Sequence, residues 1–126
     1  LKPILMIYGI GIDMVYIPKF KKAVEKWGDR FKERVFTRSE LEYCEKKGFP
    51  EQHLAARFAV KEALFKALGK GMTFTDIEVI NSQDGRPYIQ TRNQKSEIRN
   101  FKPHISISHD KDYCIAQVVL EVCRQI

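Results

Sequence analysis

One segment, LAARFAVKEALFKALGKG at residues 54–71, constrains the fold of this chain more than any other. Its alanines and leucines are strong helix formers. Pro50 stands where a proline can open a helix, and Gly69 and Gly71 provide a C-terminal stop. The segment therefore predicts a helix of about four turns or more, beginning near Pro50.

The predicted helix is apolar or small around almost its whole circumference. At roughly 100° per residue, the alanines and Val60 occupy most of one side. The larger apolar residues share the other side, which is formed by Leu54, Phe58, Leu64, Phe65 and Leu68. We therefore expect this helix to be the central element, buried on several sides.

Four charged side chains nevertheless lie on the same helix: Arg57, Lys61, Glu62 and Lys66. Buried charges are costly unless they are paired or bound. In one interpretation, Glu62 and Lys66 form a surface ion pair at i, i+4 spacing, and the other two reach solvent along their stems. In the other, a carboxylate lies beside two or three cations, a combination that suits a metal ion and an anionic ligand.

The N-terminal segment MIYGIGID predicts a strand over Met6–Asp13. Alternation places its glycines and Asp13 on one face, and glycines on a strand face allow another backbone or a ligand to approach closely. The segment does not fit the GxGxxG dinucleotide motif. Asp13 is either a cap or turn aspartate or a second functional carboxylate.

The remaining elements follow from periodicity and turn signals. A basic helix is expected from Ile17 to Trp27, ending at Gly28, and a second one after the capping box Thr37–Glu40, ending near Lys47. Later segments predict strands at Thr75–Ile80, Pro87–Gln90, His104–His109 and Tyr113–Val122, with a short helix or loop at Arg92–Asn100. This order predicts an α+β fold: an antiparallel sheet with helices, including the long central one, packed on one face.

Length and composition narrow the function classes. A chain of 126 residues predicts one domain. The net charge of +6 favours anionic partners: nucleic acid, phosphate-bearing small molecules or an acidic protein. No apolar run approaches the roughly 20 residues of a membrane span, so no membrane partner is expected. Three cysteines without a CxxC pair favour reduced thiols and a cytoplasmic location.

Several chemistries are disfavoured by spacing. Residues 69–73 lack the P-loop pattern, no Cys/His group has zinc spacing, and Ser108 and His109 point to opposite faces of a strand. The remaining set is Asp13, Arg57, Lys61, Glu62, Lys66 and His109. Two carboxylates suit Mg²⁺ together with phosphate oxygens and water, and nearby cations suit the phosphates. The set therefore indicates phosphoryl-type transfer.

Three blocks carry a resemblance to a known family: MIYGIGIDMVYIPKF, FTRSELEYCEKKGFPEQHLAARFAVKEALFKALGKG and HISISHDKDYCIAQVVLE. With them, the chain resembles the holo-[acyl-carrier-protein] synthases, which are small-type 4′-phosphopantetheinyl transferases. The resemblance covers Met6 to Glu121 and leaves Leu1–Leu5 as an extension. It implies Mg²⁺-dependent transfer of 4′-phosphopantetheine from coenzyme A to a serine of apo-acyl carrier protein, with release of adenosine 3′,5′-bisphosphate. It also implies fatty acid biosynthesis and a homotrimer with active sites at subunit interfaces.

The resemblance also implies roles for individual residues. Asp13 and Glu62 match metal ligands, and Glu62 is a candidate to activate the serine. Lys66 matches a lysine that faces the CoA phosphates. We expect the CoA-binding set to be Arg57, Lys61, Lys66, Gly69 and His109, and the set that binds the acidic carrier to be Lys19, Arg30 and Arg34.

Some positions depart from the family pattern. Tyr16 replaces a common acid, and Asp110 follows His109 where a hydroxyl residue is frequent. Lys19 stands where arginine is familiar, so a bidentate grip becomes a point-charge contact. The alternative function is a basic nucleic-acid-binding module without catalysis, in which Asp13 and Glu62 are structural. A third is a CoA-binding regulator that does not turn over its ligand.

Overall fold

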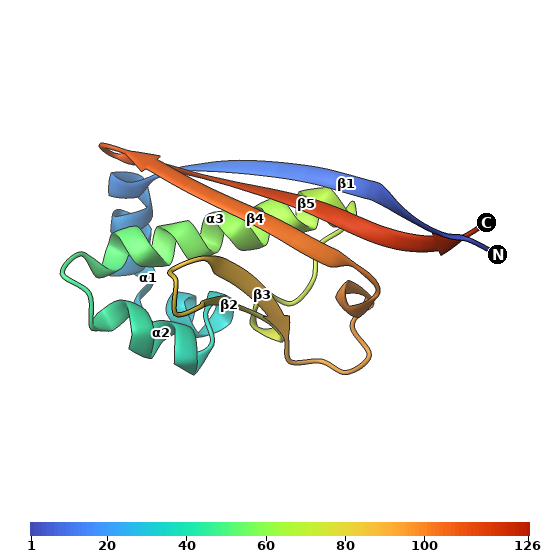
Figure 1. Ribbon diagram of the computed structural model, residues 1–126. Helices are drawn as coiled ribbons and strands as arrows, with labels where there is room; N and C mark the ends of the chain where they lie inside the picture. Colours follow the sequence, from blue (N-terminus) through green and yellow to red (C-terminus); the bar gives the residue numbers. More distant parts are fainter.

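The computed structural model describes all 126 residues and confirms the α+β class (Figure 1). It contains three α-helices, five strands and two short 3₁₀ turns. In chain order they are β1 (Pro3–Tyr16), α1 (Ile17–Val35), α2 (Arg38–Glu45), α3 (Pro50–Leu68), η1 (Phe74–Asp76), β2 (Ile77–Asn81), β3 (Pro87–Thr91), η2 (Glu97–Asn100), β4 (Lys102–Asp110) and β5 (Tyr113–Gln125).

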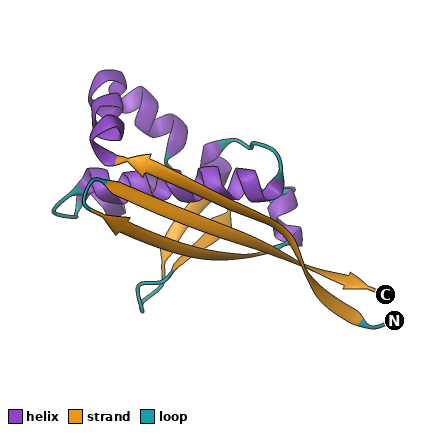
Figure 2. Ribbon diagram, turned by 90° about the horizontal axis from the view of Figure 1, so that it is seen from above, coloured by secondary structure: helices purple, strands orange, loops and turns teal.

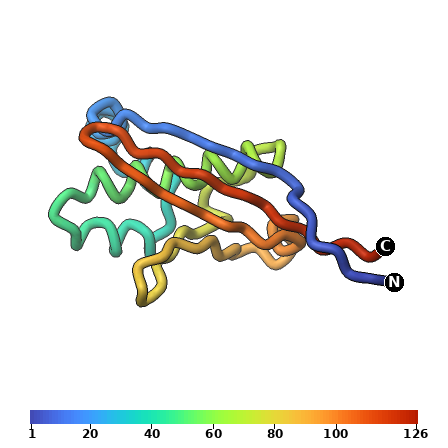
Figure 3. The backbone as a smooth tube through the Cα atoms, turned by 45° about the horizontal axis from the view of Figure 1, so that its top comes forward, coloured from blue at the N-terminus to red at the C-terminus, as the bar shows by residue number.

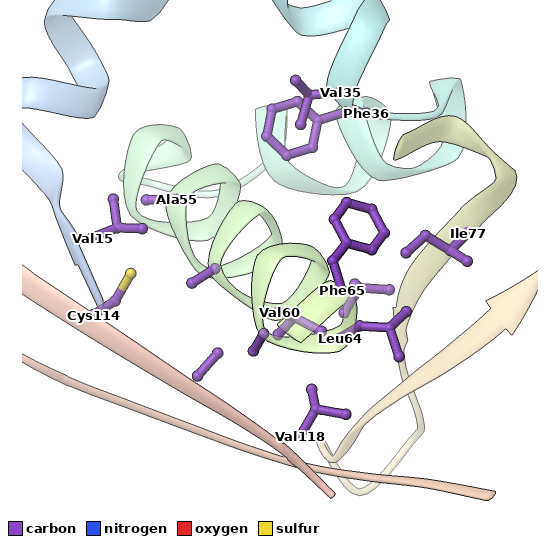
Figure 4. Close-up of a cluster of buried hydrophobic side chains, with 14 of the residues drawn as sticks. Val15, Val35, Phe36, Ala55, Val60, Leu64, Phe65, Ile77, Cys114 and Val118 are labelled. Atoms are coloured by element: carbon purple, nitrogen blue, oxygen red, sulfur yellow. The ribbon is translucent and has the colours of Figure 1, made fainter. Parts of the chain in front are cut away.

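Helix α3 is the centre of the molecule, as its composition predicts. An antiparallel sheet of order β1-β5-β4 covers one side of it, and the other helices and the β2-β3 hairpin lie on the other side (Figures 1 and 2). Val60 and Leu64 of α3 are completely buried. Figure 4 shows α3 between Val118 of β5 and Phe36, which follows α1. Gly69 ends the helix in the left-handed conformation (φ 89°), as expected from its position.

The glycines of β1 bring this strand directly onto α3. A Cβ atom built on Gly11 would lie 1.8 Å from the carbonyl oxygen of Ala63, and one on Gly9 would lie 1.9 Å from that of Ala67. The close approach predicted from the strand glycines therefore involves another backbone. The β1 register shifts between Ile7 and Gly9, and beyond this bulge Gly11 and Val15 are buried.

Several element boundaries differ from the sequence predictions. Helix α1 continues beyond Gly28, which has φ 61° and ψ −143° and joins two helical halves across a kink. Strands β1 and β5 are longer than predicted because they pair with each other along their whole length. Their outer ends are joined by hydrogen bonds between Lys2 and Ile126, and the two termini lie side by side (Figure 3).

Other local predictions are confirmed. Thr37 and Glu40 form both hydrogen bonds of the capping box at the start of α2. The β2-β3 hairpin forms around the turn at residues 82–86, although Thr75 and Asp76 belong to the 3₁₀ turn that precedes β2. None of the helices combines the length and the apolar character that crossing a membrane requires.

Candidate active site

Asp13 and Glu62 line one open cleft of about 540 Å³. Asp13 lies near the end of β1 on the same face as Gly11, and Glu62 lies in the middle of α3. Because β1 packs against α3, two carboxylates that are 49 positions apart in the chain reach the same space. The other lining residues are Met14, Val15, Tyr16, Lys19, Phe20, Ala23, Phe31 and Phe58.

Lys66 extends from α3 to β1. Its ammonium lies 3.2 Å from Oδ1 of Asp13 and donates a hydrogen bond of 2.9 Å to the carbonyl oxygen of Ile12. No ion pair joins Lys66 to Glu62, so the predicted i, i+4 surface pair is wrong. The lysine instead contributes a positive charge to the Asp13–Glu62 cleft.

The two carboxylates influence each other electrostatically. Partial burial raises the pKa of Glu62, the negative charge of Asp13 raises it further, and the positive charge of Lys66 offsets part of this effect. A divalent cation in the cleft would offset the repulsion between the two negative charges. Mg²⁺ takes one or two carboxylates and completes its coordination with substrate oxygens and water. No group of three His, Cys, Asp or Glu side chains comes together in the structure, so two carboxylates that leave positions open fit Mg²⁺ better than a closed structural metal site.

Arg57 occupies a second cationic site on the first half of α3. It is only 4% exposed, which contradicts the interpretation that it reaches solvent. Its guanidinium donates a 2.7 Å hydrogen bond to Oδ1 of Asn81 and lies 4.5 Å from the centre of the Tyr43 ring. Its Nε atom is buried and has no hydrogen-bond partner. A buried donor without a partner is rare in folded proteins, so this group has unused capacity for an anion.

Arg57 and His109 both lie close enough to His53 to act on its charge. Burial lowers the pKa of His53, and the positive charges of Arg57, Lys47 and His109 lower it further. His109 is exposed near the end of β4, whereas His53 lies at the start of α3. The fold therefore collects basic groups from α3, β4 and the loop before α3 in one region, as an anion-binding site requires. Lys47 and His53 belong to no motif, so the sequence alone does not indicate a role for either.

Lys61 does not belong to either site. Its side chain is wholly buried, and its ammonium donates to Oε1 of Glu40 (2.7 Å) and to the carbonyl oxygens of Val35 (2.7 Å) and Phe74 (3.0 Å). These three acceptors use all three protons of the ammonium. The expectation that Lys61 binds the cofactor is therefore corrected to a structural role. Gly69 is exposed and caps α3.

Three basic residues of α1 lie at the Asp13–Glu62 cleft or beside it. Lys19 lines that cleft directly. Arg30 and Arg34 line a neighbouring cleft of about 510 Å³, and the two clefts share Ala23 and Phe31. Trp27, which also lines the second cleft, is 60% exposed. The structure thus places all three predicted carrier-binding residues around adjoining clefts.

Known proteins are similar in sequence to this chain over most of its length. Residues 9–118 match the 4′-phosphopantetheinyl transferase superfamily. The chain is 44% identical over 123 residues to a holo-[acyl-carrier-protein] synthase of Clostridium tetani, covering 92% of this chain and 97% of the relative. It is 47% identical over 117 residues to a synthase of the same name from Thermodesulfovibrio yellowstonii, covering 91% and 99%.

Solved structures of similar proteins share the fold of this chain. A holo-(acyl-carrier-protein) synthase from Bacillus anthracis in complex with CoA (3′,5′-ADP) is similar with a TM-score of 0.79 and 38% identity, covering 93% of this chain and 98% of that one. A synthase from Neisseria meningitidis gives a TM-score of 0.84 at 32% identity, covering 91% and 98%. A Helicobacter pylori synthase in complex with coenzyme A gives 0.78 at 36% identity, covering 88% and 98%.

Proposed function

The chain belongs to the 4′-phosphopantetheinyl transferase superfamily and, within it, to the holo-[acyl-carrier-protein] synthases, and on this premise we propose its reaction and the roles of its residues. It transfers the 4′-phosphopantetheine group of coenzyme A to a serine of an apo-acyl carrier protein. The reaction uses Mg²⁺ and releases adenosine 3′,5′-bisphosphate. The observation that carries the proposal is that Asp13 and Glu62 line one cleft, with the ammonium of Lys66 paired to Asp13.

The transfer is a displacement at the β-phosphorus of CoA. The serine oxygen forms the new P–O bond, and the bond from this phosphorus to the bridging oxygen breaks. The bridging oxygen leaves with adenosine 3′,5′-bisphosphate, and the serine proton passes to the Glu62 carboxylate directly or through water. The position of Glu62 supports this role, because its carboxylate lines the cleft into which the serine would reach.

Asp13 and Glu62 are the residues that would hold Mg²⁺. The ion supplies charge neutralisation for the pyrophosphate oxygens and the departing nucleotide. Lys66 adds a positive charge at the same place. Arg57 and His109 bind the phosphate at the nucleotide end, a role that the unpartnered Nε of Arg57 and the surrounding cationic cluster support.

The carrier protein binds on α1. Lys19, Arg30 and Arg34 present positive charge beside the active-site cleft, and Trp27 presents an exposed aromatic surface. An acidic helix of the carrier fits this surface, because its carboxylates can pair with the three cations and its apolar side chains can pack on Trp27. Such contacts would place the carrier serine next to Asp13 and Glu62.

The working form is a homotrimer with active sites at subunit interfaces. The outward face of β1 exposes Ile10, Ile12 and Met14, which are 61%, 56% and 62% exposed in the isolated chain. A contiguous apolar strip of this kind favours association, and neighbouring copies would cover it. The enzyme acts in the cytoplasm, in fatty acid biosynthesis. All three cysteines are free, which agrees with the reducing conditions of the cytoplasm.

Incubation with CoA and an apo-acyl carrier protein, with and without Mg²⁺, tests the function. We expect the mass of one phosphopantetheine on the carrier and an equal amount of adenosine 3′,5′-bisphosphate, both only with Mg²⁺. CoA binding without product would instead indicate a regulator. Binding of nucleic acid with no response to CoA would favour the alternative of a basic, non-catalytic module.

A further inference from the structure

The ammonium of Lys66 is paired with Asp13, one of the carboxylates that the proposed function assigns to the metal ion. It lies 3.2 Å from Oδ1 of Asp13 and is also held by the carbonyl oxygen of Ile12. We propose that Lys66 is an exchangeable counter-cation: it neutralises Asp13 in the free enzyme, competes with the divalent cation there, and moves to the pyrophosphate when CoA binds. The inference rests on the proposed function and deepens it.

The Lys66–Asp13 pair has the properties of a contact that can exchange. The Lys66 side chain is 54% exposed, whereas that of Asp13 is 17% exposed, so the ammonium can move into solvent while the carboxylate stays in the partly buried cleft. A lysine carries its charge on a flexible four-carbon stem, so the ammonium can move without moving the helix. Lys61 of the same helix differs, because its pair with Glu40 of α2 is closed to solvent: both side chains are 0% exposed.

Competition follows from the charges in the cleft. Asp13 and Glu62 supply two negative charges, and Lys66 cancels one of them while it rests on Asp13. A divalent cation entering the cleft meets this ammonium a few ångströms away, and like charges at such distances repel strongly in a partly buried site. The pyrophosphate of CoA supplies another acceptor for the ammonium, so CoA frees Asp13 for the metal.

Such an exchange couples the two ligands. If CoA raises the affinity for the metal by some factor, the metal raises the affinity for CoA by the same factor. Lys66 would then favour binding of the metal ion together with CoA over binding of the metal ion alone. Removing the ammonium should tighten metal binding without CoA and reduce the coupling.

Mn²⁺ binding measured by electron paramagnetic resonance, with the enzyme at equilibrium and no carrier protein, tests the exchange. Lys66→Met keeps the stem and removes the charge. Lys70→Met is the matched control, because Lys70 is 55% exposed just beyond the same helix and pairs with Glu97 instead. Without CoA, we expect K66M to bind Mn²⁺ about 5- to 20-fold more tightly than the unmodified enzyme and K70M to stay within about twofold.

With CoA present, the unmodified enzyme should bind Mn²⁺ more tightly than without it, and this gain should shrink in K66M. Equal or weaker Mn²⁺ binding by K66M without CoA would overturn the exchange. Asp13→Asn separates this failure from that of the proposed function. If D13N weakens Mn²⁺ binding but K66M changes nothing, only the exchange is wrong. If D13N binds Mn²⁺ as well as the unmodified enzyme does, the proposed metal site is wrong as well.

Discussion

The ammonium of Lys61 lies 2.7 Å from the carboxylate of Glu40, and both side chains are completely buried. Glu40 also accepts a hydrogen bond from the backbone N–H of Val79, and Lys61 donates to the carbonyl oxygen of Val35. The pair therefore ties the end of α1, the start of α2 and strand β2 to the middle of α3. Lys61 immediately precedes Glu62, so this contact fixes the helix at the position of the proposed active site.

Lys61→Met should destabilise the fold strongly. It leaves the Glu40 carboxylate buried without its counter-charge, and breaking a buried pair from one side costs about 3–5 kcal/mol. Urea unfolding followed by circular dichroism measures the loss. Arg38→Met is the control, because it breaks the exposed Arg38–Glu42 pair and should cost less than about 1 kcal/mol. Equal effects of the two variants would refute a structural role for the buried pair.

Gly11→Ala should push β1 away from α3. The new Cβ atom would lie 1.8 Å from the carbonyl oxygen of Ala63, and backbone cannot yield as a side chain can. We expect the free energy of unfolding to fall by about 1–3 kcal/mol or more. Transfer activity should fall by more than this loss of stability explains, because Asp13 lies two residues further along the strand. Gly71→Ala meets nothing within 4 Å and should be nearly neutral. Calorimetry measures the stability of both variants, and a carrier-loading assay measures their activity. An unchanged melting temperature for G11A would contradict the close packing of β1 on α3.

Arg57→Met should weaken recognition of the nucleotide end of CoA more than the chemical step. The guanidinium carries a buried donor without a partner, and a charged hydrogen bond contributes about 1.5–3 kcal/mol. We expect KM for CoA to rise by about 10-fold or more, with a smaller change for 3′-dephospho-CoA. The ratio of kcat/KM for CoA to that for 3′-dephospho-CoA is the control, because general damage to the enzyme would lower both values alike. An unchanged ratio would exclude Arg57 from phosphate binding.

The arginines of α1 should govern carrier binding. Replacing both Arg30 and Arg34 by Gln removes two charges from the cleft next to the active site. We expect KM for the carrier to rise by about 5- to 50-fold with little change in KM for CoA, and the salt dependence of carrier binding to weaken. Arg99→Gln removes an exposed charge from η2 and should leave both constants unchanged. A carrier affinity that is equal in low and high salt would contradict the charge-based contact.

Local chemistry in the sequence predicted much of the fold. The alanine-rich segment defined α3, the Thr37–Glu40 box defined the start of α2, and the Gly9–Gly11 pattern predicted a close approach. The sequence predicts a helix end at Gly28, because a glycine stops a helix locally. In the structure the helix resumes after a kink, where Phe31 and Val35 pack on the core. Strand lengths depend on partners distant in the chain and could not be predicted from their own residues.

The candidate site was predicted by residue type, but not by pairing. Spacing suggested that Lys66 pairs with Glu62, whereas the packing of β1 on α3 brings it to Asp13. Lys61 looked equivalent to the other cations of α3, yet Glu40 holds it in the core. A residue at i, i+4 is visible in the sequence, and a partner 21 or 53 positions away is created only by the tertiary fold.

In the proposed mechanism, Asp13 and Glu62 together hold the divalent cation that transfer requires. The most direct test of this arrangement is single-turnover loading of an apo-acyl carrier protein by Asp13→Asn and Glu62→Gln at saturating Mg²⁺, with Glu42→Gln as an exposed control. We predict that each of the first two variants stays folded and loses at least about 100-fold in rate, while E42Q loads at the normal rate. Normal loading by either folded variant would contradict this arrangement.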